Sequence, residues 1–290
     1  MAGEYEDRKR LTFEQAEGAE PLPSQLKLRE VSPELRARLW SIFHKALQND
    51  SLADDCGRAD VQEPFLTLLY DLHVERWCRA ADEFTSSLEY WIAELKGVFM
   101  KGDYIKVFGL TQWMLRHRHQ PYRLVEDLDY ALYITRAAYA VLDRDTIVPI
   151  GSEAERDTLV RAFADVAASK FHGVRAHLRN AGSELTTGNF GPSIRESIHA
   201  VEAVARVLAP GAQTLGPALS KLEKSVRLHP ALGKGFSNLY GFTSDEKGIR
   251  HALLDEPAAQ VDETDALYML GSCAAFVSYL INKAGQAGLL

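Results

Sequence analysis

The stretch PSIRESIHAVEAVARVL, residues 192–208, is the clearest guide to the fold of this chain. Its apolar residues recur three or four positions apart: Ile194, Ile198, Val201, Ala205 and Leu208. At about 100° per residue these side chains share one face, which predicts an amphipathic helix with that face in a core. The polar residues between them lie along the flank of the same helix.

The same spacing continues on both sides of this stretch. Ser32 and Pro33 form a typical helix start, with an N-capping hydroxyl followed by proline at the first helical position. Further helices are predicted over 62–77, 80–100, 103–118, 122–137, 153–169, 171–182, 216–228, 230–240 and 263–284. We therefore expect a mainly all-α fold, with the aromatic residues of the first half filling space between helices.

A short β-hairpin is the one predicted exception to the helical pattern. Apolar residues at 140–142 and 146–148 flank the turn sequence Asp143-Arg144-Asp145, which indicates two short strands within 139–149. The next helix begins with a capping box, Ser152 to Glu155. The predicted organisation is a polar N-terminal arm over 1–31, a helical domain over 32–150 and a second helical domain over 151–290.

Composition limits the classes of function. The net charge is -7, which argues against bulk binding of double-stranded DNA, because cationic side chains supply most of that affinity. The three cysteines are far apart in sequence, so we interpret them as small core residues in a reducing compartment. The N-terminus has no apolar signal-peptide region, and the apolar stretch 266–281 is shorter than the roughly 20 residues of a membrane span. We expect a cytoplasmic protein without membrane contact.

The first candidate site lies on the helix quoted above. Arg195, His199 and Glu202 stand at positions i, i+4 and i+7, so a cation, an imidazole and a carboxylate line one flank beside the apolar face. One interpretation is a partly buried acid-base cluster in which Glu202 orients His199 or a basic partner. The alternative is a surface helix with ordinary ion pairs.

The second candidate is the pair Arg250 and His251 within the sequence GIRHA, residues 248–252. Arginine can hold a phosphate with its planar guanidinium, and an imidazole can move a proton near neutral pH, so the pair suits RNA cleavage. A weaker candidate is the run Arg116-His117-Arg118-His119, which we interpret as cations complementing a helix end. The sequence has no P-loop, no G-x-S-x-G elbow and no H-E-x-x-H motif, and we expect no cofactor and no metal.

Several blocks of sequence, in order, resemble one family. The chain is similar, over nearly its whole length, to bacterial proteins with an AbiJ-type N-terminal domain of the fourth subtype joined to a HEPN-like C-terminal helical domain. The resemblance rests on VSPELRARLW (31–40), RESIHAVE (195–202), TLG (214–216), HPAL (229–232), LYGFTS (239–244), GIRHAL (248–253) and SCAAFV (272–277).

The resemblance implies a role in phage defence or abortive infection. It also implies a C-terminal HEPN-like bundle, in a homodimer, that cleaves or binds RNA without a metal ion. The HEPN motif is an arginine, four to six residues and a histidine. This chain instead has Arg195 and His199 with three residues between them, and Arg250 directly before His251.

Two hypotheses follow. In the first, Arg250, His251 and Glu202 form the centre of an RNA site, with Arg195 and His199 in reserve. In the second, the protein is a non-catalytic sensor or interaction module, and Arg250 pairs with Glu202 as a buried structural ion pair. In either case the N-terminal half could recognise the trigger to which the C-terminal half responds.

Overall fold

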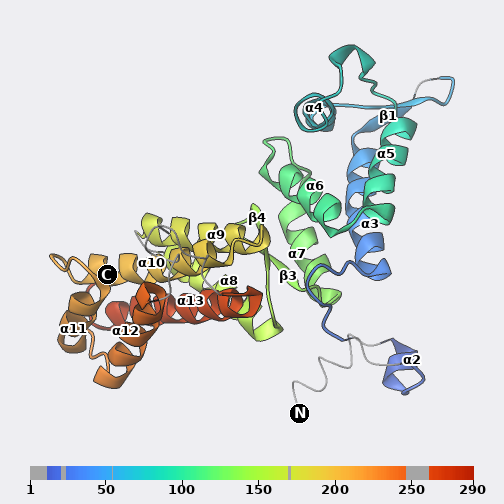
Figure 1. Cartoon of the computed structure of the whole chain (residues 1–290). Coiled ribbons are helices and arrows are strands. Elements are labelled where there is room, and N and C mark those ends of the chain that lie inside the picture. Colours follow the sequence, from blue (N-terminus) through green and yellow to red (C-terminus); the bar gives the residue numbers. More distant parts are fainter. Residues whose placement is uncertain (1–11, 21–23, 54, 169–170, 246–260) are drawn as a thin grey trace, which may run out of the picture. The chain divides into compact units, whose positions relative to one another are not determined.

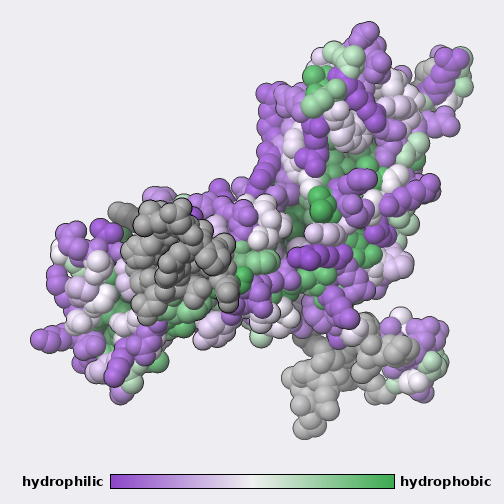
Figure 2. Space-filling view, viewed as in Figure 1, coloured by the Kyte–Doolittle hydropathy of each residue, from purple (hydrophilic) through white to green (hydrophobic). Residues whose placement is uncertain are grey.

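The chain folds into helices with two small two-stranded sheets, which confirms the mainly all-α prediction (Figure 1). The computed structural model describes residues 12–20, 24–53, 55–168, 171–245 and 261–290. It divides into two units, one ending at Asp145 and one beginning at Thr146. The surface visible in Figure 2 is mostly hydrophilic, with hydrophobic residues in smaller patches among the helices.

The N-terminal unit is built around α3, which packs against α5 and α7. Its core includes Phe43 of α3 stacked on Phe99 of α5, with 4.8 Å between the ring centroids. Its elements are α2 (Phe13–Ala16), α3 (Pro33–Asn49), β1 (Ser51–Ala53), β2 (Ala59–Val61), α4 (Phe65–Asp71), the π-helix Leu72–Arg76, the 3-10 helix Ala81–Glu83, α5 (Leu88–Lys101), α6 (Tyr104–Arg116), α7 (Leu124–Ile134) and β3 (Tyr139–Leu142).

Three segments of this unit differ from the prediction. The two-stranded sheet of β1 and β2 was not predicted, since the only strands expected were those of the hairpin near 139–149. The helix expected over 80–100 begins only at Leu88, because the residues before it bond elsewhere: Ser86 O accepts the Val61 N–H at 2.9 Å, and Thr85 O accepts the Trp91 indole N–H at 2.7 Å. The arm predicted over 1–31 contains the four-residue α2. It is also bonded to the rest of the N-terminal unit at Leu26, whose backbone N–H donates to Arg136 O at 2.9 Å.

The C-terminal unit is built around α10, which packs against α9, α11, α12 and α13. The apolar face predicted for this helix is buried, including Ile194, Ile198 and Val201. The elements of the unit are β4 (Thr146–Pro149), α8 (Glu153–Ala167), α9 (His172–Thr186), α10 (Phe190–Leu208), α11 (Leu215–Ser225), α12 (Pro230–Asp245) and α13 (Glu263–Gln286). β3 and β4 form the second two-stranded sheet, at the position of the predicted hairpin.

Helix α13 is longer than the apolar stretch predicted from sequence. Its length and hydropathy would suffice to cross a membrane, but 56% of its most apolar 18 residues are buried inside the protein. A polar contact also ties it to α8: Asp165 Oδ2 accepts hydrogen bonds from Ser278 Oγ at 2.6 Å and from Asn282 Nδ2 at 2.9 Å. These contacts are those of a helix packed in the core of the C-terminal unit.

The cysteines are not all core residues, contrary to the prediction. Cys273 is buried in α13, whereas Cys56 and Cys78 are exposed in the N-terminal unit. Burial raises the pKa of the Cys273 thiol to about 12, because the thiolate would lose its hydration. The three thiols therefore differ in reactivity.

We predict that Ellman's reagent titrates the thiols of Cys56 and Cys78 in the native protein and reaches Cys273 only after unfolding. The measurement is the number of thiols per chain that react with the reagent at mildly alkaline pH, with and without denaturant. Rapid reaction of a third thiol in the native chain would contradict the burial of Cys273.

Helix α9 lies close to β4 at Gly182. A Cβ atom at this position would overlap with Cγ1 of the Val148 side chain. We predict that Gly182→Ala lowers the free energy of unfolding by about 1–3 kcal/mol, because the helix or the strand must shift. The measurement is the denaturant midpoint.

Gly235 of α12 provides the matched control, because a Cβ there would meet no atom within 4 Å. Gly235→Ala should raise stability by up to about 1 kcal/mol through helix propensity alone. If both variants shift the denaturant midpoint in the same direction, the close contact of Gly182 with Val148 does not determine the stability of the Gly182→Ala variant.

Candidate functional site

The site is held by the packing of α9 against α10, which lie side by side in Figure 1. Small residues line this contact, and the buried Ser193 hydroxyl of α10 donates a hydrogen bond to Ala181 O of α9 at 2.8 Å. The Ser197 hydroxyl donates to Ser193 O one turn below, also at 2.8 Å. The Ser193 bond crosses between the helices and fixes their register, whereas the Ser197 bond lies within α10.

On the flank of this contact, three ionisable side chains come together: His177 of α9, and Glu196 and His199 of α10. His177 Nδ1 lies 2.8 Å from Glu196 Oε2, and His199 Nδ1 lies 3.9 Å from Glu196 Oε1. The two imidazole centroids are 5.4 Å apart, with an interplanar angle of 68°. The carboxylate therefore stands between two histidines from different helices.

The cluster is partly open to solvent. The side chains of His177, His199 and Glu196 are 34%, 32% and 18% exposed, so the carboxylate is the most enclosed member. When His177 donates Nδ1–H to Glu196, its Nε2 lone pair is left to accept a proton. A half-exposed imidazole held in one tautomer by a carboxylate is suited to general acid-base chemistry.

The same three side chains could also hold a divalent metal ion. Their ligand atoms all lie within 4.8 Å of one another. Two imidazoles and one carboxylate are a common ligand set for zinc, with a fourth position left for water or substrate. In the structure the carboxylate already accepts a hydrogen bond from His177, which satisfies it without a metal.

The structure places the predicted residues of α10 as follows. Arg195, His199 and Glu202 follow one side of the helix, and all three are partly exposed. Glu202 forms an ion pair with Arg206, at 3.8 Å between Oε1 and Nη1, and the carboxylate that reaches His199 is that of Glu196. Glu202 therefore has an i,i+4 partner on its own helix.

Arg250 and His251 lie outside the described residues, as does the GIRHA sequence around them. The proposed contact of Arg250 with Glu202 therefore stays a prediction. His177 and Glu196 were not among the predicted site residues. Glu196 neighbours Arg195 in sequence, but His177 comes from a different helix, and no spacing within one segment connects it to α10.

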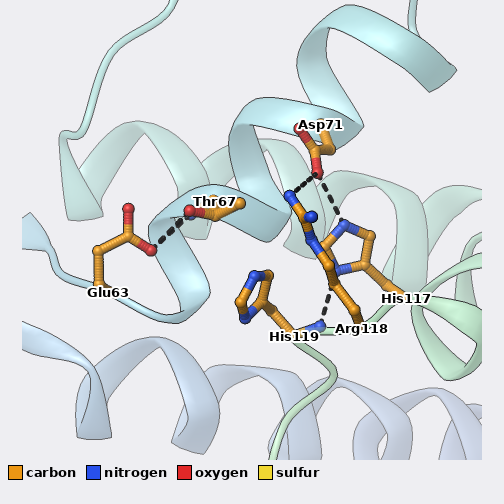
Figure 3. A network of polar contacts seen from close by, with 6 residues as sticks. All are labelled: Glu63, Thr67, Asp71, His117, Arg118 and His119. Carbon is orange, nitrogen blue, oxygen red and sulfur yellow. Dashed lines mark hydrogen bonds and ion pairs between the residues drawn. The ribbon is translucent and has the colours of Figure 1, made fainter.

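His117, Arg118 and His119, from the Arg116-His117-Arg118-His119 run, belong to a separate polar network in the N-terminal unit, shown in Figure 3. α6 ends at Arg116, and His117 Nε2 donates to Asp71 Oδ2 at 3.0 Å. His117 Nδ1 accepts the backbone N–H of His119 at 3.1 Å. Both ring nitrogens are thus engaged, so this histidine ties the end of α4 to the segment after α6.

Searches against protein-family models, curated proteins and solved structures found no match to this chain. The resemblance to AbiJ-type and HEPN-like proteins therefore stays a prediction from sequence. The functional interpretation rests on the chain's own residues.

We predict that His117→Ala lowers the free energy of unfolding by about 1–3 kcal/mol, because the partly buried Asp71 carboxylate loses its hydrogen-bond donor. Arg118→Ala is the control. Its side chain is 73% exposed and 4.0 Å from Asp71, so its loss should cost less than about 1 kcal/mol. Equal effects of the two substitutions on the denaturant midpoint would contradict the structural role of His117.

Proposed function

We propose that the C-terminal unit cleaves RNA without a metal ion, with His177 and His199 as its acid-base pair. The observation that carries the proposal is the Glu196 carboxylate between the two imidazoles, 2.8 Å from one and 3.9 Å from the other. The resemblance to HEPN-like proteins gives the substrate class, and the cluster gives groups that can perform the chemistry.

In the proposed reaction, His177 Nε2 takes the proton of a ribose 2′-hydroxyl. The 2′-oxygen attacks phosphorus, the bond from phosphorus to the 5′-oxygen breaks, and protonated His199 gives its proton to that oxygen. The products are a 2′,3′-cyclic phosphate and a 5′-hydroxyl. With 5.4 Å between their centroids, both rings can reach one phosphodiester.

The other cluster members have supporting roles in this proposal. Glu196 orients His177 and stabilises the imidazolium formed when the ring accepts the proton. Arg195 lies one turn before His199 on α10, where a guanidinium favours binding of a phosphate. Arg250 and His251 stay candidates for additional contacts with RNA.

We predict that the purified chain cuts RNA in the presence of a chelator and leaves cyclic phosphate ends. His177→Ala and His199→Ala should each lower the cleavage rate by about 100-fold or more, the usual contribution of general acid-base catalysis. His172→Ala is the matched control. It replaces an exposed histidine at the start of α9 and should keep the wild-type cleavage rate.

Three results would overturn this proposal. Loss of cleavage on chelation would mean that the cluster acts through a metal ion. If both cluster variants keep full activity and His251→Ala is inactive, the catalytic centre lies in the GIRHA sequence. A wild-type chain that leaves RNA intact, and whose cluster variants unfold early, would favour the non-catalytic alternative, in which Glu196 only clamps α9 to α10.

The cellular setting that we propose is the one implied by the resemblance: a cytoplasmic homodimer active in phage defence. Growth on overexpression tests it, because a defence ribonuclease should be toxic to its host and His199→Ala should relieve the toxicity. Light scattering of the purified chain gives its oligomeric state.

A further inference from the structure

A cavity of about 450 Å³ in the N-terminal unit has the size and lining of a small-ligand site. Its walls come from α3, from the turn before α7, and from α7 itself. The residues used below are Arg38 and Lys45 of α3, Asp50 at its C-terminal end, Tyr122 and Arg123 of the turn, and Asp127 and Tyr130 of α7. The lining residues of α3 and of α7 recur at helical spacing, so the cavity runs along one face of each helix.

The aromatic residues of the cavity are exposed. The side chains of Tyr130 and Tyr122 are 60% and 92% exposed, although both line the cavity wall. Other large aromatic residues of this unit, such as Trp91 and Phe99, are fully buried in its core. A tyrosine ring presented to a cavity offers a face on which a planar ring can stack.

The charges of the cavity favour a ligand that carries both phosphate and hydrogen-bond donors. Arg38 is paired with Glu34 at 2.9 Å, whereas within the described part of the chain Lys45 forms no ion pair. Lys45 can therefore meet an anion, and Arg123, whose charge also acts on Glu126, places a second cation in the cavity wall. The carboxylates of Asp50 and Asp127 can accept bonds from hydroxyl or amine groups of the same ligand.

Two local features are consistent with a binding role. Arg123 has φ of 58°, in the left-handed region that residues other than glycine rarely adopt, and this residue forms the N-cap of α7 without a side-chain cap. Burial raises the pKa of the Asp50 carboxyl above its usual value, because the ionised form loses hydration. A ligand donor facing Asp50 would compensate for this loss.

We propose that this cavity binds a nucleotide, with its base stacked on Tyr130 and its phosphates on Lys45 and Arg123. A nucleotide combines the planar ring, the anion and the hydroxyl donors that the lining matches, and the cavity volume lies within the range of small-molecule sites. Stacking tolerates any base, so the proposal concerns nucleotides as a class.

Isothermal titration calorimetry of the full chain with ATP tests the proposal, with adenosine and inorganic tripolyphosphate as separate probes. ATP should bind with one site per chain, and more tightly than either of its parts. Tyr130→Leu, which keeps an apolar side chain and removes the ring, should weaken ATP binding by about tenfold. Arg123→Gly should weaken it similarly while relieving the left-handed backbone.

Matched controls separate the site from general effects of charge and aromatic surface. Lys45→Ala should weaken binding of ATP and tripolyphosphate but not of adenosine. Lys96→Ala, which removes an exposed lysine of α5, should leave the affinities for all three probes unchanged. The Tyr268→Leu variant, which removes an exposed tyrosine of α13, should also bind ATP with the wild-type affinity. Unchanged ATP affinity in the Tyr130 and Arg123 variants, equal losses in the controls, or no ATP binding at millimolar concentration would overturn the proposal.

Discussion

The close packing of α9 against α10 is the constraint on which the proposed active site depends. The apolar face of α10 supplies most of the stabilisation, because each buried isoleucine or valine contributes about 1.5–3 kcal/mol, against about 1 kcal/mol for a hydrogen bond. The core therefore sets the distance between the helices, and the Ser193 bond to Ala181 fixes their register. Glu196 can contact histidines on both helices only because this distance is short.

Both units carry polar groups at the rim of a helical core, and each has a different arrangement. In the C-terminal unit, a carboxylate links two partly exposed imidazoles, an arrangement suited to proton transfer. In the N-terminal unit, cations, carboxylates and exposed tyrosines line a cavity. This difference fits the hypothesis of a unit that recognises a signal and a unit that responds to it. The His117 network is of another kind, since both ring nitrogens are already bonded.

Much of the fold follows from local patterns in the sequence. The period of apolar residues predicts the helices, the Ser32-Pro33 start is observed at α3, and the strands near 140 and 147 are present. The late start of α5 was not predictable in this way, because residues before Leu88 bond to a strand that is distant in sequence. The exposure of Cys56 and Cys78 likewise depends on tertiary structure.

The candidate site was predicted only in part, for a related reason. Helical spacing places Arg195, His199 and Glu202 on one side of α10, but it does not say which carboxylate meets the imidazole. The structure brings Glu196 to His199 and adds His177 from α9, which required knowledge of how the helices pack.

The protonation pattern of the His177 ring tests the central claim most directly, by two-dimensional ¹H–¹⁵N NMR of the histidine side chains. Free neutral histidine favours the proton on Nε2. If Glu196 holds His177 as described, the neutral ring carries its proton on Nδ1, and Glu196→Gln perturbs the signals of both His177 and His199. A ring protonated on Nε2, with signals of both histidines unchanged in that variant, would contradict the account.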